Sequence, residues 1–252
     1  MIRVSKDRSR WVVIVLVKLN IEGYGELVVE IEELGAGGEL ISRLPFSSKV
    51  ETWKEEVYFK TPLERVEGKT VSKVEGGAVA LWPPGKALCV FYGVSQPYSP
   101  VVPIGEVVGP YHTLSEVKSG VEVKVEEYPS DEGLPLQLRK RGICAAERTI
   151  GGESSVVMNV RSKGKIFRFE AFEEDYGISL EGEALFKRTE DYAETTFLGK
   201  VKRLLSRFER VRVDVNEEGY LILSAYAEDL KGLVESLNQL VEAYEKVYEI
   251  LG

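Results

Sequence analysis

The sequence predicts two domains, an all-β barrel in the first half and an α+β domain in the second. The first half consists of short apolar runs separated by glycine and proline turns, with almost no helical pattern. Proline, glycine and polar residues concentrate in Tyr128–Pro135, as is typical of a domain boundary. We therefore expect a barrel over residues 1–128, a linker over 129–135 and an α+β domain over 136–252.

The composition is that of a soluble acidic protein. Of the 252 residues, 44% are hydrophobic, which is enough for a large buried core. The net charge of −8 disfavours nucleic acid as a partner, because binding a polyanion needs a concentrated basic surface. Heavy use of glutamate, lysine and arginine, with few amide side chains, is typical of a thermophile.

Neither a membrane nor a metal is expected as a partner. The apolar run Trp11–Val17 is too short to span a bilayer, and no signal-peptide pattern precedes it, so we expect a cytoplasmic protein. The two cysteines, Cys89 and Cys144, are far apart and form no zinc pattern. We expect Cys89 to pack as a small hydrophobe, and we expect no cofactor.

The elements of the barrel follow from apolar runs and the residues that break them. Trp11–Ile21 is a β-branched run that fits a central strand buried on both faces. A short helical stretch at Glu39–Arg43 is expected to end before Pro45, and Ser95–Pro103 is expected to be a proline-punctuated loop. Further strands are expected at Glu26–Glu32, Phe46–Phe59, Ile104–Val108 and Val121–Glu127.

The most distinctive stretch of the barrel is Ala78–Gly93, with the sequence AVALWPPGKALCVFYG. It predicts an apolar strand, a tight corner and a second apolar strand. The corner consists of Trp82, Pro83, Pro84, Gly85 and Lys86.

The second domain is expected to have the order β-β-β-α-β-β-α. Its expected elements are strands at Ser155–Arg161, Ile166–Phe172 and Ile178–Lys187, a helix at Thr189–Phe208, and a hairpin of Val211–Val215 with Tyr220–Tyr226. Asp229 is expected to cap a final helix that continues to Leu251. The wide apolar stripe of that helix suits a helix lying across a sheet.

Three runs of the first half form an ordered series that carries a family resemblance. They are Glu39–Phe46 (ELISRLPF), Trp53–Phe59 (WKEEVYF) and Ala80–Cys89 (ALWPPGKALC), and they are followed by Gly93 and by Ile104–Gly109 (IGEVVG). Together they resemble the prokaryotic cyclophilin-like domain family, roughly from Arg10 to Tyr128. The resemblance implies a closed β-barrel related in fold to cyclophilins, in a family whose biochemical role is largely unassigned.

The resemblance does not carry an activity over. Cyclophilin prolyl isomerases depend on an arginine beside an apolar proline pocket, within a strand of the F-H-R-V type. The corresponding strand here would be Phe46–Phe59, which offers Lys49 and Lys54 but no arginine. Lysine could donate a hydrogen bond near the prolyl nitrogen, but it lacks the rigid planar fork of arginine. Whether the protein is an enzyme therefore stays open.

Five residues are candidates for a ligand-binding site: Glu56, Tyr58, Trp82, Pro84 and Lys86. Because the corner prolines fix the backbone, Trp82 could form the rim of an apolar groove, or it could pack inside a rigid corner. Lys86 could hold a carboxylate or phosphate, or be a plain surface charge. Glu55 and Glu56 point to opposite faces of a strand, so only one can face a pocket, and the resemblance favours Glu56 together with Tyr58.

We expect no catalytic residue and no metal ligand. His112 is the only histidine and has no identified nucleophile or second ligand beside it. The favoured hypothesis is a non-catalytic protein that binds a peptide or small molecule near Trp82–Lys86, while the α+β domain supplies dimerisation or a second partner surface. The alternative is a divergent peptidyl-prolyl cis/trans isomerase, with a lysine or a backbone donor in place of the arginine.

Overall fold

A computed structural model describes residues 2–7, 10–129 and 132–251, with side chains from residue 13 onward. The chain divides into two compact units, Met1–Ser154 and Ser155–Gly252. Of the linker expected at residues 129–135, residues 130–131 lie outside the described residues, and helix α2 (Gly133–Arg139) begins within it. Helix α2 and strand β11 (Cys144–Ile150) were not predicted from the sequence, and both belong to the first unit.

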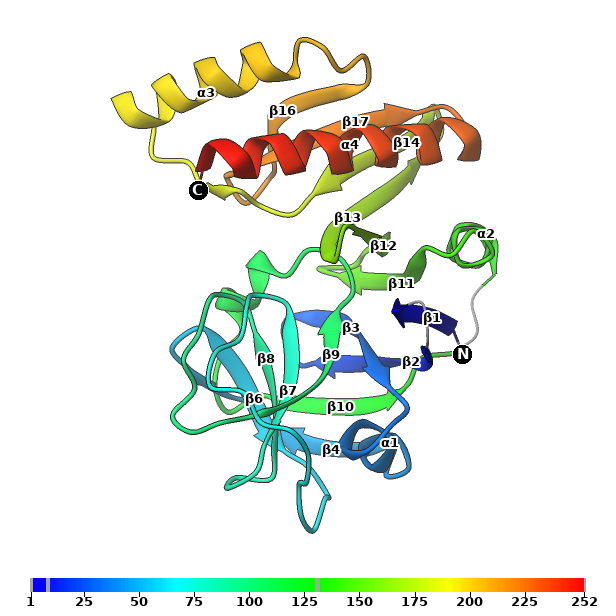
Figure 1. Ribbon diagram of the computed structural model, residues 1–252, viewed down its shortest axis with the longest axis vertical. Coiled ribbons are helices and arrows are strands. Elements are labelled where there is room, and N and C mark those ends of the chain that lie inside the picture. The colour runs from blue at the N-terminus through cyan, green and yellow to red at the C-terminus, as the bar shows by residue number, and fades with distance from the viewer. Residues whose placement is uncertain (1, 8–9, 130–131, 252) are drawn as a thin grey trace. The chain divides into compact units, whose positions relative to one another are not determined.

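The first unit is a strongly curled antiparallel sheet (Figure 1). Its further strands are β1 (Ile2–Asp7), β2 (Arg10–Ile21), β3 (Gly25–Glu32), β4 (Phe46–Lys49), β5 (Glu51–Trp53), β6 (Glu56–Lys60), β7 (Ala78–Trp82), β8 (Ala87–Phe91), β9 (Val102–Val107) and β10 (Glu122–Glu127). Successive pairings run β5–β6–β8–β7–β9–β3–β2–β10–β4. Because only the buried Val50 separates β4 from β5, the two ends of this order are consecutive in the chain.

The short helices of the first unit are α1 (Ala36–Ile41) and the 3-10 helix η1 (His112–Glu116). The strand expected at Phe46–Phe59 is broken into β4, β5 and β6. The first break is Val50, whose backbone pairs with Val121 and Gly120, and the second is a turn in which Lys54 has a φ of 51°. Strand β9 begins inside the loop expected at Ser95–Pro103, because the sheet accepts Pro103 beside an irregularity in β7.

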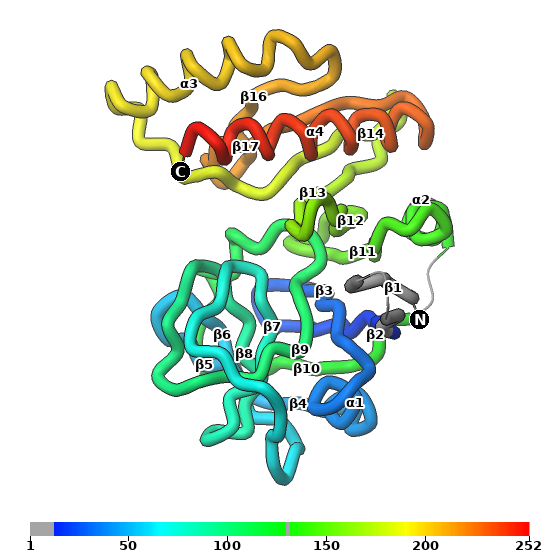
Figure 2. Tube along the Cα trace, viewed as in Figure 1, coloured from blue at the N-terminus to red at the C-terminus, as the bar shows by residue number. Residues whose placement is uncertain are grey.

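The two faces of strands β6, β8 and β7, which run side by side in Figure 2, are packed differently. Inward-facing residues such as Val57, Phe59 and Leu88 belong to the large core of the unit. The opposite face carries a small second cluster that includes Ala80, Cys89 and Phe91, with Tyr58 and Trp82 against it. The alternation of a β-strand thus places Glu56 and Tyr58 on the face away from the main core.

Gly105 shows why part of the IGEVVG run is restricted to glycine. It lies opposite Ile31 in the pairing of β9 with β3. A Cβ atom at this position would lie 1.9 Å from the carbonyl oxygen of Glu30. The two backbones therefore approach closely enough to exclude every side chain.

The second unit follows the expected element order, except that the strand expected at Ile178–Lys187 is divided into two strands. Its strands are β12 (Glu153–Ser162, which begins at the end of the first unit), β13 (Lys165–Glu174), β14 (Gly177–Gly182), β15 (Phe186–Lys187), β16 (Val211–Val215) and β17 (Tyr220–Ala227). Strands pair in the order β12–β13–β14–β17–β16, and β15 also pairs with β17. Helix α3 (Tyr192–Leu205) packs on β16, and α4 (Leu230–Leu251) packs on β17.

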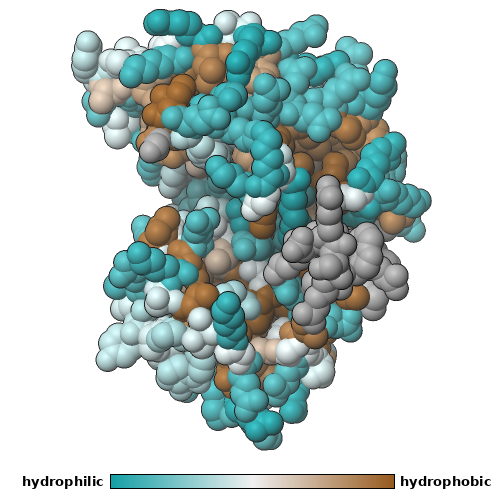
Figure 3. All heavy atoms as spheres, in the orientation of Figure 1, coloured by the Kyte–Doolittle hydropathy of each residue, from teal (hydrophilic) through white to brown (hydrophobic). Residues whose placement is uncertain are grey.

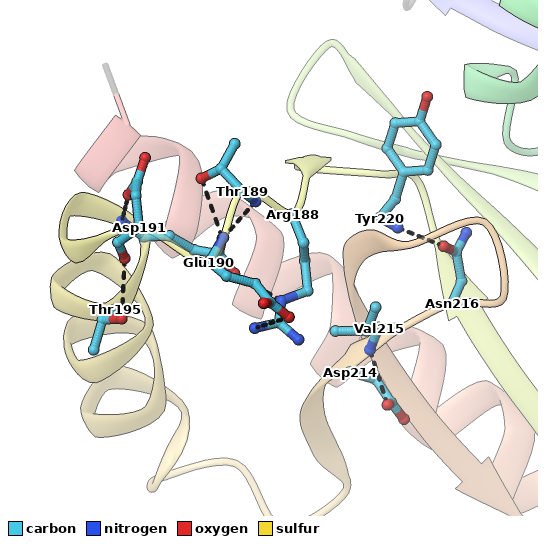
Figure 4. A network of polar contacts seen from close by, with 10 residues as sticks. Arg188, Thr189, Glu190, Asp191, Thr195, Asp214, Val215, Asn216 and Tyr220 are labelled. Atoms are coloured by element: carbon cyan, nitrogen blue, oxygen red, sulfur yellow. Dashed lines mark hydrogen bonds and ion pairs between the residues drawn. The ribbon is translucent and has the colours of Figure 1, made fainter.

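Both helices of the second unit begin at an aspartate. Asp229 Oδ1 accepts a hydrogen bond from the backbone N–H of Gly232 at 2.7 Å, so the predicted cap of α4 is confirmed. Asp191 accepts from the backbone N–H of Glu194 at 2.8 Å, which starts α3 three residues later than expected (Figure 4). Thr189 lies outside the helix because its N–H donates to the Glu194 carboxylate instead.

Polar side chains cover most of the surface shown in Figure 3, with apolar atoms between them as separate patches. Among the described residues, no helix combines the length and the hydropathy needed to cross a bilayer.

Candidate functional site

A pocket of about 200 Å³ lies on the outer face of β6, β8 and β7. Strand residues form one wall, and the segment from Pro97 to Val101 supplies the rest of the lining. The pocket is lined by Trp53, Glu56, Tyr58, Trp82, Cys89, Pro97, Tyr98 and Val101. Aromatic rings and aliphatic groups dominate this lining, and Glu56 is its one acidic side chain.

The structure brings together three of the five residues that the sequence singled out. Glu56, Tyr58 and Trp82 all line the pocket. Pro84 and Lys86 are exposed at the corner between β7 and β8 and do not contribute to the lining. Lys86 has a φ of 49°, and its carbonyl oxygen accepts hydrogen bonds from the backbone N–H and the hydroxyl of Thr61. Its backbone therefore anchors the corner, while its exposed side chain does not line the pocket.

The Pro-Pro-Gly corner fixes the indole of Trp82. A Cβ atom on Gly85 would lie 2.3 Å from the Trp82 ring, so the ring packs directly against the glycine backbone. The indole Nε1–H donates a hydrogen bond of 2.7 Å to the Ser99 hydroxyl, which ties the corner to the segment that completes the pocket. Trp82 is half-buried, and it is both packed against the corner and part of the pocket wall.

Glu56 is the chemically unusual member of the pocket. The residue is only 6% exposed, and its Oε2 atom accepts no hydrogen bond from the described residues. Burial raises the pKa of the Glu56 carboxyl to about 7, and the positive charge of Lys54 opposes this shift only partly. The carboxyl can therefore either carry or release a proton at neutral pH. Glu55, its neighbour in the chain, is exposed and does not line the pocket.

The charges near the pocket are mainly negative. Burial raises the pKa of the Tyr58 phenol, and the carboxylates of Glu51 and Glu56 raise it further. Burial, followed by Glu55 and Glu56, acts in the same direction on the pKa of Tyr92. The pKa of the Cys89 thiol is also raised, chiefly by burial and then by Glu56, so this thiol stays protonated and unreactive at neutral pH.

Sequence reasoning missed five lining residues: Trp53, Cys89, Pro97, Tyr98 and Val101. Trp53 could have been found from the hairpin, since it pairs with Glu56 across the tight turn. Tyr98 belongs to a loop whose position depends on tertiary contacts, so no local sequence pattern predicts that it lines the pocket.

In the described part of the chain, no group of three or more histidine, cysteine, aspartate and glutamate side chains is arranged to hold a metal ion. His112 lies on the 3-10 helix η1, away from the pocket lining.

Comparison with known proteins places the fold of the first unit in a family. The model of the cyclophilin-like family matches residues 16–126. The solved structure of the hypothetical protein AF2241 from Archaeoglobus fulgidus is 32% identical, covering 48% of this chain and 98% of that chain, with a TM-score of 0.40. No curated protein matches the chain significantly. The resemblance seen in the sequence is confirmed: through residues 16–126, the chain belongs to the cyclophilin-like family.

Proposed function

We propose that the first unit is a non-catalytic binding module whose pocket takes a small molecule or one side chain of a peptide. The observation that supports this most directly is the buried carboxyl of Glu56, whose Oε2 atom has no hydrogen-bond partner among the described residues. A buried polar group without a partner costs stability. That cost is recovered when a ligand supplies the missing contact.

The dimensions of the pocket limit what could enter it. Its volume of about 200 Å³ is smaller than the roughly 300–1,000 Å³ typical of sites for drug-sized ligands. It suits a ligand group with a few heavy atoms, flanked by parts that stay outside. Tyr98, which is 85% exposed, is well placed to contact those outer parts.

The proposal is tested by two-dimensional NMR of the labelled full chain with a library of small molecules and short peptides. We expect a subset of compounds to shift resonances of the pocket residues, and we expect Trp82→Ala to abolish those shifts. Lys86→Gln is the matched control, because Lys86 belongs to the same corner but is exposed and outside the pocket. Shifts that survive Trp82→Ala, or that vanish equally with Lys86→Gln, would place binding elsewhere.

One observation favours the alternative, a divergent prolyl isomerase. At pH values below about 7 the Glu56 carboxyl carries a proton, so it can donate a hydrogen bond inside an apolar aromatic pocket. Such a donor would stand in for the arginine that the chain lacks in Phe46–Phe59. Binding of a prolyl ring against Trp82 would then precede rotation about the peptide bond.

The alternative is tested by NMR exchange spectroscopy on a short Xaa-Pro peptide, with and without the protein. Isomerisation assisted by Glu56 would be faster at pH 6 than at pH 8 and would be lost in Glu56→Met. Line broadening without faster exchange would favour the binding module, and an unchanged spectrum at both pH values would exclude the isomerase.

A further inference from the structure

We propose that the pocket binds an alkylammonium group, either of a small amine or of a lysine-type side chain, through Glu56 and the surrounding aromatic rings. This inference rests on the proposed function and names the chemistry of the ligand. It is built from three features of the pocket: the carboxyl that has no partner, the aromatic lining, and the sign of the surrounding charge.

The carboxyl of Glu56 provides a specific partner for a cation. Its residue is 94% buried, it lines the pocket, and Oε2 accepts no hydrogen bond from the described residues. An ammonium group entering the pocket would supply both the missing hydrogen bond and the counter-charge. An anionic ligand would instead meet a carboxylate at short range, which is unfavourable in a site shielded from water by burial.

The aromatic lining adds an attraction that cations gain and neutral ligands do not. Trp53, Tyr58, Trp82 and Tyr98 make up four of the eight lining residues. An ammonium or methylated ammonium group is attracted to the negative face of such rings. One of these rings already has a cation beside it, because Lys54 Nζ lies 4.3 Å from the centroid of the Trp53 ring. The Trp53 ring is therefore able to hold an ammonium group against its surface.

The charges around the pocket favour the same ligand. Glu51 pairs with Tyr58 across β5 and β6, and Glu55 lies beside Gly93 next to Tyr92. Against these two carboxylates and Glu56 itself, the hairpin carries two lysines, Lys54 on the turn and Lys60 at the far end of β6, and of the two only Lys54 acts on the pKa of Glu56. The titratable groups that face Glu56 from the neighbouring elements are Lys54 on the turn, Tyr58 on its own strand, Cys89 and Tyr92 on or beside β8, and Tyr98 on the loop.

The protonation state of Glu56 should make ligand affinity depend on pH in a direction that can be measured. An ammonium ligand binds the ionised carboxylate, so its binding should strengthen as pH rises through about 7. A neutral ligand that accepts a hydrogen bond from the protonated carboxyl should show the opposite trend. The direction of the pH dependence therefore distinguishes the two ligand classes at the same pocket.

The test uses n-butylamine, its uncharged analogue 1-butanol, and a short peptide with one unmodified lysine, each titrated against the full chain by NMR. We expect the amine or the peptide to bind at pH 8, about tenfold more weakly at pH 6, and about tenfold more tightly than the uncharged analogue. Glu56→Gln should weaken binding about tenfold and remove the pH dependence. Glu55→Gln, a neighbouring exposed carboxylate, is the matched control and should keep both properties.

Each outcome decides between the two proposals. Binding of n-butylamine indicates a free amine as the source of the group, and binding of the peptide alone indicates a protein side chain. Equal binding of the uncharged analogue, or tighter binding at pH 6, would overturn the cation inference while leaving the binding module intact. If no cationic probe binds, the cation inference fails, and the library experiment above decides separately whether the pocket binds anything.

Discussion

Two of the buried glutamates, one from each unit, have pKa values shifted in opposite directions. Glu56 in the first unit is 6% exposed, lacks a partner for Oε2, and has a pKa raised to about 7 by burial. Glu194 in the second unit is 4% exposed, and its pKa is lowered to about 2, first of all by the hydrogen bond from Arg188. Burial alone therefore does not decide the charge of a carboxyl; the donors around it do.

The contrast can be traced to local structure. Glu194 sits in the first turn of α3, where its carboxylate accepts hydrogen bonds from Arg188 Nε at 2.8 Å and from the backbone N–H groups of Thr189 and Glu190 at 2.7 and 2.6 Å. These are donors that a helix N-terminus and the preceding turn leave available (Figure 4). Glu56 lies in mid-sheet, where backbone donors are already used by neighbouring strands.

The two carboxyls make opposite contributions to stability as pH changes. The pKa of Glu194 is below its ordinary value of 4.5, so its contribution is present above pH 4.5 and is lost as pH falls towards 2. The pKa of Glu56 is raised above 4.5, so its contribution to the stability of the first unit is fully present below pH 4.5 and is lost as pH rises through about 7.

The two units can be followed by different spectroscopic probes. All three tryptophans belong to the first unit, so tryptophan fluorescence reports on that unit, whereas far-UV circular dichroism is dominated by α3 and α4 of the second unit.

The largest effect is expected for Glu194→Ala. Removing the carboxylate leaves the Arg188 side chain and the N–H groups of Thr189 and Glu190 without their acceptor, so the unfolding temperature of the second unit should fall by several degrees at pH 7. Thermal unfolding followed by circular dichroism measures this change. Glu190→Gln, at an exposed carboxylate that only approaches Arg188 at 3.7 Å, should leave the transition nearly unchanged. A wild-type transition in Glu194→Ala would show that the network contributes nothing.

In contrast to Glu194→Ala, which should destabilise the second unit, Glu56→Gln should stabilise the first unit. At pH 8.5 the substitution removes a buried charge whose pKa shift from 4.5 to about 7 corresponds to a cost of about 3 kcal/mol, which is an upper bound for the gain. At pH 5, where the native carboxyl is already protonated, the gain should disappear. Urea unfolding followed by tryptophan fluorescence measures both values, with Glu55→Gln as the exposed control. Destabilisation at pH 8.5 would mean that the Glu56 carboxylate has a favourable partner after all.

The two sites also differ in how far the sequence reveals them. Alternation along β6 places Glu56 and Tyr58 on one face, and the Trp-Pro-Pro-Gly corner singles out Trp82. Three of the five pocket residues that lie on strands are therefore predicted by local pattern. Pro84 and Lys86 belong to the same motif, but they shape the backbone of the turn and do not line the pocket. The local sequence pattern is the same for a residue that shapes a turn and for one that contacts a ligand. Tyr98 and Pro97 reach the pocket only through tertiary packing of a long loop.

The capping arrangement in the second unit could have been read from the sequence. Asp191 and Glu194 have the spacing of a capping box, which also predicts that α3 begins after Asp191 and not at Thr189. The break that divides the strand expected at Ile178–Lys187 into β14 and β15 could not be predicted in this way. It depends on how each part pairs with β17, which is a tertiary contact.

A glycine-to-alanine substitution should lower the free energy of unfolding in the first unit and raise it in the second. Gly85→Ala places a methyl group 2.3 Å from the Trp82 ring, so the first unit should lose about 1–3 kcal/mol and the tryptophan emission should shift. Gly199→Ala, within α3 and with no atom within 4 Å of the new methyl group, should stabilise the second unit by about 0.4–1 kcal/mol. Denaturant unfolding monitored by both probes compares them. Equal stability of wild type and Gly85→Ala would show that the Trp82 ring is free to move.

The smallest effect is expected for Lys54→Asn, which removes the positive charge that opposes the burial of Glu56. Asparagine tolerates the φ of 51° at this turn position, so the hairpin should be preserved. Because Lys54 is exposed and its charge is screened by water, the pKa of Glu56 should rise above about 7 by only a fraction of a unit. The corresponding change in the second unit, Arg188→Met, removes the strongest donor to Glu194 and should move the pKa of that carboxyl clearly back towards 4.5. Carbon-13 NMR titration of the two carboxyl groups measures both changes. A large rise in the pKa of Glu56 would show that Lys54 is its ionic partner. The pocket would then contain a neutralised ion pair instead of a carboxyl group available to a ligand.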